Sequence, residues 1–433
     1  MKKYYPVILI IFFLSLALRL FAVTSMQVAQ EGDPASYNIL ANSIIERMEF
    51  SYTPGKPVSW RPPLYPLFLA IIYIIGKHSY LLVGIAQALI GSLTCVFIYW
   101  IAMKFFVKAV AVTAGLISAC YLYFIVSTKF LMTEVLFIFL LTASIYYFIK
   151  AIKKNFLFRD AALSGFLMGL ATLTRSITLF LPVFIFIVIF FSRIAGLKIL
   201  SRFFITALIF FLIPLSAWTT RNYLVHGKLI PVATSGGMNF FIGNTPDENG
   251  RYRVRGPSKK ETQEMEDIKP KSEVEIDKFY FKKASDYIFT HPRDVVRLIA
   301  VKVIFFWSPF DWYFFGNKGV YNYHYAFILP FSLMGMFLCA KKWREYVLLY
   351  LPIVYFALIS LVFHVETRYR MPIDPFLIIF ASYSFFYLYS RHKNKCLPVL
   401  IISGLFGINF LLYLYSDVLK QGARHILQIT GLW

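Results

Sequence analysis

Carboxylates and arginines of the kind that act on hydroxyl and phosphate groups occur together in one short stretch near the start of the chain, 31–66. Asp33 is expected at the start of a short amphipathic helix that ends near residue 48. Arg61 stands just before a second, apolar helix over 64–75. A carboxylate can deprotonate a hydroxyl or bind a divalent cation, and a guanidinium fork suits a phosphate. The stretch therefore predicts a polar site in one connected loop, although Asp33 alone could serve only as a helix cap.

Further charged side chains stand at the ends of long apolar segments. Glu134 follows a threonine where one such segment begins, and Arg175 and Arg221 stand where two others end. A carboxylate at a helix N-terminus complements the helix dipole, and an arginine at a helix C-terminus satisfies free carbonyls. These three residues therefore have a structural interpretation beside the functional one.

A polar segment, HVETRYRMPIDP, begins at His364 and concentrates more groups of the same types. Its arginines, Arg368 and Arg370, add to the guanidinium groups described above. His364 and Glu366 have a spacing that two metal ligands on a loop can use, so with Asp33 they form a candidate site for a divalent ion (Mg, Mn or Zn). A single pair of this kind is weak support for a metal.

The composition places these groups in a membrane protein. Of the 433 residues, 59% are hydrophobic and 19% aromatic, while only 15% are charged. That apolar share exceeds the usual share of a soluble domain, and it comes in blocks of membrane-spanning length. The net charge of +22 arises from lysines and arginines between these blocks, which is typical of cytoplasmic loops rather than of a nucleic-acid-binding surface. The four cysteines show no CxxC spacing and are interpreted as small core residues.

The apolar blocks predict an all-α polytopic membrane fold with about eleven transmembrane helices. The first block is interpreted as an uncleaved span, because no small-x-small cleavage site accompanies it. The block at 64–75 is too short to cross a bilayer and is expected to lie at the interface. The spans are expected near 5–23, 80–103, 109–127, 134–150, 161–175, 177–192, 203–220, 324–340, 346–363, 371–390 and 397–415.

The basic residues orient these spans. With the N-terminus inside, every cluster of lysines and arginines between the blocks falls on the cytoplasmic side, as the positive-inside rule requires. A true span at 64–75 would break this pattern. The polar segment 222–297 then lies outside and is interpreted as a lid rather than as a small domain. Arginines on that outer face have no topological reason to be there, so they favour an anionic group such as a lipid phosphate.

We expect three regions along the chain. The first, 1–220, is transmembrane and contains the catalytic outer loop, 24–79. The second, 221–323, is the larger outer loop with interfacial helices, and the third, 324–433, holds the C-terminal spans. The spans contain almost no ionisable residues at mid-membrane depth, whereas transport paths usually do. This pattern favours an enzyme at the interface over a transporter.

Several short motifs follow one another along the chain: GDPxxY, RPPLYPLFLA, SxxxLMTE, GLATLTR, WTTRNYLVHGKLIPVATSGGMNFFIGN and ETRYRMPIDP. Together they resemble the bacterial members of the protein-mannosyltransferase and aminoarabinose-transferase group, which are GT-C type glycosyltransferases of family 39. Each motif is short and degenerate, but the resemblance covers nearly the whole chain in order. It implies a GT-C fold with amphipathic interfacial helices in the first outer loop, an inverting transfer, and an undecaprenyl- or dolichyl-phosphate sugar donor.

The resemblance also implies roles for individual residues. By position, Asp33 matches the acidic residue of the family's first loop, the base or metal-linked carboxylate, and Glu134 matches the acidic residue of its second outer loop. Many members carry two adjacent acidic residues in the first loop, whereas here the other acidic residue is Glu31, which leaves the division of roles open. The candidates for the donor phosphate are Arg61, Arg175, Arg221, Arg368 and Arg370. The substrate pocket is expected to include Tyr37, Tyr65, Asn222, Asn244 and Tyr369.

We therefore predict an integral membrane glycosyltransferase, a hexosyl or pentosyl transferase, that moves a sugar from a polyprenyl phosphate to a hydroxyl or phosphate of an acceptor. It is expected in the bacterial cytoplasmic (inner) membrane, with its site facing the periplasm or the exterior. The expected partners are the lipid-linked sugar, the bilayer and an acceptor; the sequence leaves the sugar and the acceptor (lipid, glycan or protein) open. The alternatives are a flippase or other transporter of a lipid-linked sugar, and a scaffold subunit of an envelope complex.

Overall fold

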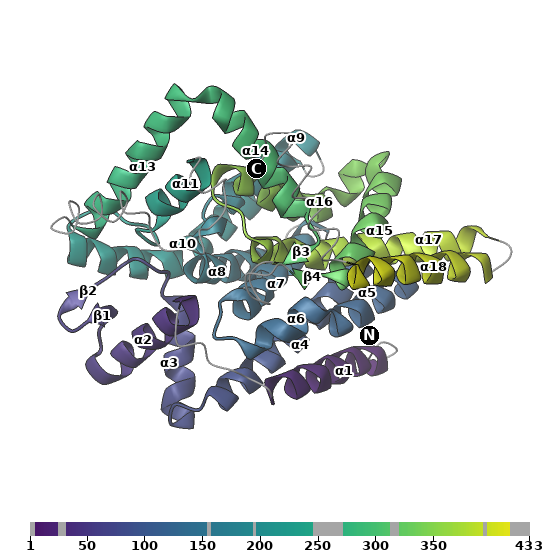
Figure 1. Ribbon diagram of the computed structural model, residues 1–433, viewed down its shortest axis with the longest axis horizontal. Helices are drawn as coiled ribbons and strands as arrows, with labels where there is room; N and C mark the ends of the chain where they lie inside the picture. Colours follow the sequence, from purple (N-terminus) through teal and green to yellow (C-terminus); the bar gives the residue numbers. More distant parts are fainter. Residues whose placement is uncertain are drawn as a thin grey trace. The chain divides into compact units, whose positions relative to one another are not determined.

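The chain is mostly helical in the computed structural model that we describe (Figure 1). The structure describes residues 5–24, 32–153, 157–193, 196–245, 272–311, 320–392 and 396–415. Glu31 and residues 246–271 of the predicted outer segment lie outside the described residues. The chain divides into two compact units. Unit 1 comprises Met1–Ala233, Pro330–Ile353 and Met371–Ser390, and unit 2 comprises Thr234–Leu329, Val354–Arg370 and Arg391–Trp433.

Unit 1 contains the helices that form from the apolar runs of the first half of the chain. They are α1 (Tyr5–Val23), α2 (Gly32–Arg47), α3 (Leu64–Gly76), α4 (Tyr80–Phe105), α5 (Lys108–Cys120), α6 (Leu122–Val126), α7 (Glu134–Lys153), α8 (Phe158–Thr174), α9 (Leu181–Ser192) and α10 (Leu197–His226). A short antiparallel hairpin, β1 (Ser51–Thr53) with β2 (Lys56–Pro57), lies between α2 and α3. Two 3₁₀ turns occupy Ser127–Lys129 and Ser176–Thr178. The unit also includes α17 (Asp374–Arg391) and parts of α15 (Tyr323–Ala340) and α16 (Trp343–Val362).

Unit 2 contains helices from the second half of the chain, together with the remaining parts of α15 and α16. Its other helices are α11 (Gly236–Asn244), α13 (Glu273–Thr290), α14 (Pro292–Trp307) and α18 (Cys396–Leu414), with a hairpin of β3 (Phe310–Asp311) and β4 (Val320–Tyr321). A 3₁₀ stretch, Thr367–Ile373, begins in unit 2 and ends in unit 1. α13 begins at a capping box, in which Ser272 and Glu275 each accept from the other's backbone N–H. Phe241 on α11 packs against Tyr280 and Ala284 on α13, which gives the unit a small apolar core.

The predicted polytopic membrane fold is confirmed, but the predicted count of eleven spans is not. Among the described residues, seven helices are long and apolar enough to cross a membrane: α1, α4, α7, α10, α15, α16 and the helical segment Thr367–Arg391, which contains α17. The bent pair Lys108–Cys120 and Leu122–Lys129 makes an eighth if it forms one span. Other predicted spans are too short on this criterion, since α8 has 17 residues and α9 has 12. α3, with 13 residues, is short as the sequence predicts.

Small residues allow α8 to pack closely against both α7 and α10 (Figure 1). A Cβ atom added at Gly165 would lie 2.0 Å from the carbonyl oxygen of Ala207, and one at Gly169 would lie 2.6 Å from that of Phe211. In membrane proteins, glycine at such contacts lets two helix backbones approach each other. α7 and α8 are antiparallel neighbours, so the start of α7 and the end of α8 lie at the same end of the bundle.

Replacing Gly165 with alanine is expected to lower the thermal unfolding temperature of the protein in nanodiscs, because the added methyl group would collide with the Ala207 carbonyl. Overpacking of this kind costs about 1–3 kcal/mol. Gly404 on α18 is the matched control, since a Cβ there meets no atom within 4 Å and alanine keeps its higher helix propensity. Equal effects of the two substitutions would show that α8 and α10 are less closely packed than described.

A buried arginine lies within the first span, where the sequence analysis did not single it out. The guanidinium of Arg19 donates to the carbonyl of Ala119 at 3.3 Å, at the end of α5, where the chain bends by 48°. It also donates to the hydroxyl of Ser15. Gly91 leaves room for it, since a Cβ there would lie 2.8 Å from Arg19 Nε. This buried cation therefore caps α5 at the break that leads towards the start of α7.

Candidate active site

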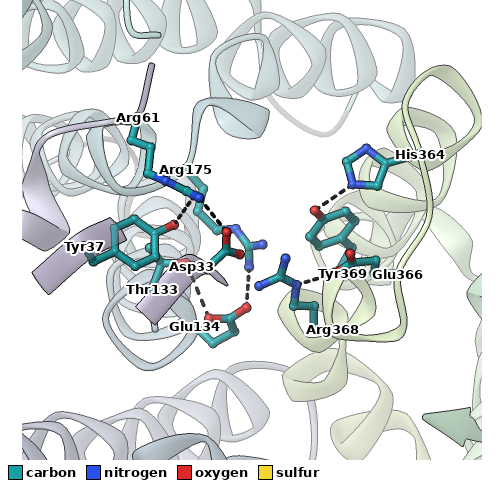
Figure 2. A network of polar contacts seen from close by, with 10 residues as sticks. All are labelled: Asp33, Tyr37, Arg61, Thr133, Glu134, Arg175, His364, Glu366, Arg368 and Tyr369. Carbon is teal, nitrogen blue, oxygen red and sulfur yellow. Dashed lines mark hydrogen bonds and ion pairs between the residues drawn. The ribbon is translucent and has the colours of Figure 1, made fainter. Parts of the chain in front are cut away.

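The first part of the candidate site joins the start of α2 to the loop before α3, as the sequence suggested (Figure 2). α2 begins at Gly32, whose positive φ of 71° is one that glycine adopts readily. Asp33 is the next residue and lies in the first turn of the helix. Arg61 donates to the Asp33 carboxylate at 2.5 Å, and the two side chains are 21% and 22% exposed. Arg61 also donates to the hydroxyl of Tyr37 at 3.2 Å and lies 4.7 Å from the centre of its ring. The first loop therefore presents a half-buried carboxylate held by an arginine.

The second part of the site is a carboxylate–arginine pair at the adjacent ends of α7 and α8. Glu134 is in the first turn of α7 and is 1% exposed. Arg175 directly follows α8, and its guanidinium lies 3.3 Å from the Glu134 carboxylate. The hydroxyl of Thr133 donates to the other carboxylate oxygen at 3.4 Å. The antiparallel packing of α7 and α8 thus brings together two residues that are 41 positions apart.

Tyr37 is the residue around which these two pairs gather. Burial raises the pKa of its hydroxyl above the usual value, and the charges of Arg61, Asp33, Arg175 and Glu134 all act on it. Burial opposes the charge on Arg61, but Tyr37 and Asp33 outweigh this effect and raise the pKa of the guanidinium. The site thus combines a neutral phenol with two carboxylates and two cations, all within unit 1 (Figure 2).

Two other predicted site residues, Arg221 and Asn222, hold the first loop against α10. Arg221 donates to the backbone carbonyls of Val58 at 2.7 Å and Phe50 at 3.2 Å. Asn222 is fully buried; it accepts from the Ser59 hydroxyl at 2.7 Å and donates to the Ile230 carbonyl at 3.1 Å. These contacts position the loop that carries Arg61.

Replacing Asn222 with alanine is expected to destabilise the protein by about 1–3 kcal/mol, because buried polar groups on both sides lose their partner. Thermal unfolding in nanodiscs measures the effect. Ser216→Ala on the same helix is the control, since Ser216 is exposed and donates within its own helix to Ile213. A loss for Asn222→Ala no larger than that of the control would contradict this role in holding the loop.

Of the remaining predicted site residues, Tyr65 lies in unit 1, where it is fully buried on α3 and its hydroxyl donates to Gln87 at 2.9 Å. The others lie in unit 2, where His364, Glu366, Arg368 and Tyr369 form a cluster (Figure 2). The His364 ring nitrogen Nε2 and the Tyr369 hydroxyl are 2.9 Å apart, and Glu366 pairs with Arg368. Arg370 is buried; its guanidinium donates to the Ser308 carbonyl at 2.6 Å and lies 3.4 Å from the centre of the Tyr325 ring. Within unit 2, Arg370 thus caps the end of α14.

Asn244 takes part in a second capping arrangement, together with a lysine that the sequence analysis missed. Lys302 on α14 is buried, and burial lowers its pKa to about 8. Its ammonium donates to the Leu361 carbonyl at 2.8 Å and to Asn244 Oδ1 at 3.1 Å, while Asn244 Nδ2 donates to the Val362 carbonyl at 2.7 Å. These bonds satisfy the last carbonyls of α16, directly before His364.

In the part of the chain that the structure describes, no three His, Cys, Asp or Glu side chains gather as metal ligands would. Asp33 belongs to unit 1 and His364 and Glu366 to unit 2, so their joint binding of a metal stays a prediction. Asp33 and Glu366 each pair with an arginine, and His364 contacts Tyr369. A site for Mg, Mn or Zn normally needs several convergent ligands. We therefore derive no chemical step through a metal.

Comparison of the sequence with known proteins finds similarity to mannosyltransferases over part of the chain. Residues 60–220 match the family of dolichyl-phosphate-mannose-protein mannosyltransferases. A stretch of 116 residues is 35% identical to part of GPI alpha-1,2-mannosyltransferase 3 of Bos taurus. The matched stretch makes up 26% of this chain and 19% of the bovine protein.

Comparison of the structure extends the likeness to most of the chain. ArnT from Cupriavidus metallidurans in the apo state matches with a TM-score of 0.60 at 13% identity, over 91% of this chain and 62% of ArnT. ArnT bound to undecaprenyl phosphate matches with a TM-score of 0.58 at 12% identity, over 98% and 72%. The oligosaccharyltransferase AglB from Archaeoglobus fulgidus, in complex with an inhibitory peptide and a dolichol-phosphate, matches with a TM-score of 0.54 at 15% identity, over 96% and 56%.

The fold of this chain is that of the GT-C type membrane glycosyltransferases, as the sequence resemblance implied. The chain spans 62% of the length of apo ArnT and 19% of the length of the bovine relative.

Proposed function

We propose that the protein is an integral membrane glycosyltransferase that takes a sugar from a polyprenyl-phosphate donor and transfers it, with inversion, to an acceptor. The observation that carries this proposal is the gathering of two carboxylate–arginine pairs, Asp33–Arg61 and Glu134–Arg175, around Tyr37. Such a set of groups can remove a proton on one side of a reacting sugar and neutralise a leaving phosphate on the other.

In the proposed reaction, Asp33 takes the proton of an acceptor hydroxyl. The acceptor oxygen forms a bond to the anomeric carbon from the face opposite the lipid phosphate, and the bond between that carbon and the phosphate oxygen breaks. The departing phosphate keeps the electron pair of that bond. Arg175 is our first candidate to neutralise it, because Arg61 is paired with the base Asp33 on the acceptor side, and Arg221 and Arg370 already bind backbone carbonyls. The products are a glycosylated acceptor and polyprenyl phosphate.

The nature of the donor is supported by the relatives. The matching family is named for dolichyl-phosphate-mannose, and the structures of ArnT and AglB hold undecaprenyl phosphate and dolichol-phosphate, respectively. The positive-inside pattern of the basic residues supports a site on the outer face of the membrane. We propose the bacterial cytoplasmic membrane as its location, with the acceptor in the periplasm or at the exterior.

Donor turnover by purified protein in nanodiscs tests this proposal. The assay supplies a panel of radiolabelled polyprenyl-phosphate sugars together with a membrane extract as the source of acceptor, and it measures the release of polyprenyl phosphate. Sugar-dependent release with label transferred to an acceptor would support the enzyme and name the sugar. Binding of a donor without release, in the presence of an acceptor that a related enzyme uses, would favour a flippase instead.

A further inference from the structure

A fully buried glutamine joins the two loops that supply the carboxylates of the site. We propose that Gln87, together with Tyr65, is a positioning residue that fixes Glu134 relative to Asp33. This inference rests on the proposed function, because it assigns these residues a part in the same reaction. Neither residue touches the reacting atoms in our proposal; both act through the segment that precedes Glu134.

Gln87 lies near the start of α4 and is 0% exposed. Its amide nitrogen donates to two backbone carbonyls, those of Thr128 at 3.1 Å and Phe130 at 3.0 Å. Its amide oxygen accepts from the Tyr65 hydroxyl at 2.9 Å. A single side chain therefore uses both its donor and its acceptor to connect α3 with the segment before α7.

Tyr65 connects this junction to the first loop. It lies in the first turn of α3, four residues after Arg61, and is fully buried. Burial raises the pKa of its hydroxyl well above the usual value, so the phenol keeps its proton and can donate to Gln87. The same hydroxyl bonds the backbone of Met132, two residues before Glu134. Its ring meets that of Tyr37 edge-on, with the centres 5.1 Å apart.

The segment from Ser127 to Thr133 needs such support because little of it is regular. A single 3₁₀ turn, Ser127–Lys129, is followed by an extended Phe130 before α7 begins at Glu134. Its backbone is therefore poorly held by secondary structure, and the bonds from Gln87 and Tyr65 replace what a helix or strand would supply. Removing Gln87 would leave two carbonyls without this partner and free the segment to move. Since a shift of about 1 Å can reduce turnover by about a hundredfold, this support bears directly on catalysis.

Two substitutions separate the parts of the junction. Gln87→Met keeps the length of the side chain and removes all three hydrogen bonds, whereas Tyr65→Phe removes only those of the hydroxyl. Ser144→Ala is the control, because Ser144 is a buried residue that bonds the Ser164 backbone between α7 and α8, with no part in the junction. For each variant, donor turnover is separated into kcat and KM, hydrogen exchange is measured over 127–133 in nanodiscs, and thermal unfolding reports stability.

We expect Gln87→Met to lower kcat by about tenfold to a hundredfold with little change in the KM for the donor, as for a misplaced catalytic group. Exchange over 127–133 should rise, and Tyr65→Phe should show smaller changes of the same kind. Normal exchange in Gln87→Met would overturn the inference whatever the activity, and faster exchange with unchanged kcat would make the junction purely structural. If the wild type turned over no donor, the proposed function and the catalytic part of the inference would both fail, while exchange would still decide whether Gln87 holds the segment.

Discussion

Replacing Asp33 with asparagine is expected to lower donor turnover by about a hundredfold or more, the usual loss when a positioned general base is removed. Asparagine has nearly the same shape and its amide oxygen can still accept the hydrogen bond from Arg61, which Asp33 accepts at 2.5 Å. It cannot take a proton from an acceptor hydroxyl. The fold should therefore persist while the chemical step slows. Release of polyprenyl phosphate, measured beside the thermal unfolding temperature, tests both parts of this expectation.

Asp160→Asn provides the matched control for the loss of a carboxylate. Asp160 lies on α8 and pairs with Lys150 of α7 at 2.7 Å, at the opposite ends of these helices from Glu134 and Arg175. It is well buried, so its loss should affect stability at least as much as the loss of half-buried Asp33. Wild-type turnover in Asp33→Asn would exclude Asp33 as the base. A similar fall in turnover in both variants would point to a general effect of removing ion pairs.

The Asp33–Arg61 pair illustrates what local sequence signals can predict. A Gly-Asp-Pro start and an arginine before two prolines mark two helix starts within one loop, and such signals act over a few residues. The structure places both helices as expected and pairs the two side chains. The polytopic membrane fold follows from apolar length in the same way. The exact number of spans does not, because helices such as α8 and α9 are near or below the length that crosses a bilayer.

Contacts between elements that are distant along the chain could not be predicted from the sequence. Glu134 and Arg175 could each be placed at a helix end, but their pairing depends on how α7 packs against α8. An arginine at a helix end can face a ligand or satisfy carbonyls, and the sequence pattern is the same in both cases. The structure shows the second use for Arg221 and Arg370, whose roles towards a phosphate remain predictions. Gln87 was missed because a single amide in an apolar run has no spacing signal.

The Glu134–Arg175 pair carries the second large prediction. Arg175→Met should destabilise the protein by about 3–5 kcal/mol, because it leaves a buried carboxylate without its cation. Glu134 is 1% exposed, whereas Arg175 is 17% exposed and reaches solvent more easily. Glu134→Gln should therefore be tolerated better than Arg175→Met. Combining the two substitutions should recover much of the lost stability, since no buried charge is then left unpaired. Thermal unfolding of the four proteins in nanodiscs measures this cycle.

Turnover in the same four proteins distinguishes a catalytic pair from a structural one. If Glu134 and Arg175 only support the fold, the double variant should recover turnover together with stability. If Arg175 neutralises the leaving phosphate and Glu134 shapes the site around it, stability should recover while turnover stays low, because no group has replaced the lost cation. A positioned cation of this kind typically contributes about a hundredfold or more to the rate. Recovery of both quantities would remove this pair from the proposed mechanism and leave Asp33 and Arg61 as its centre.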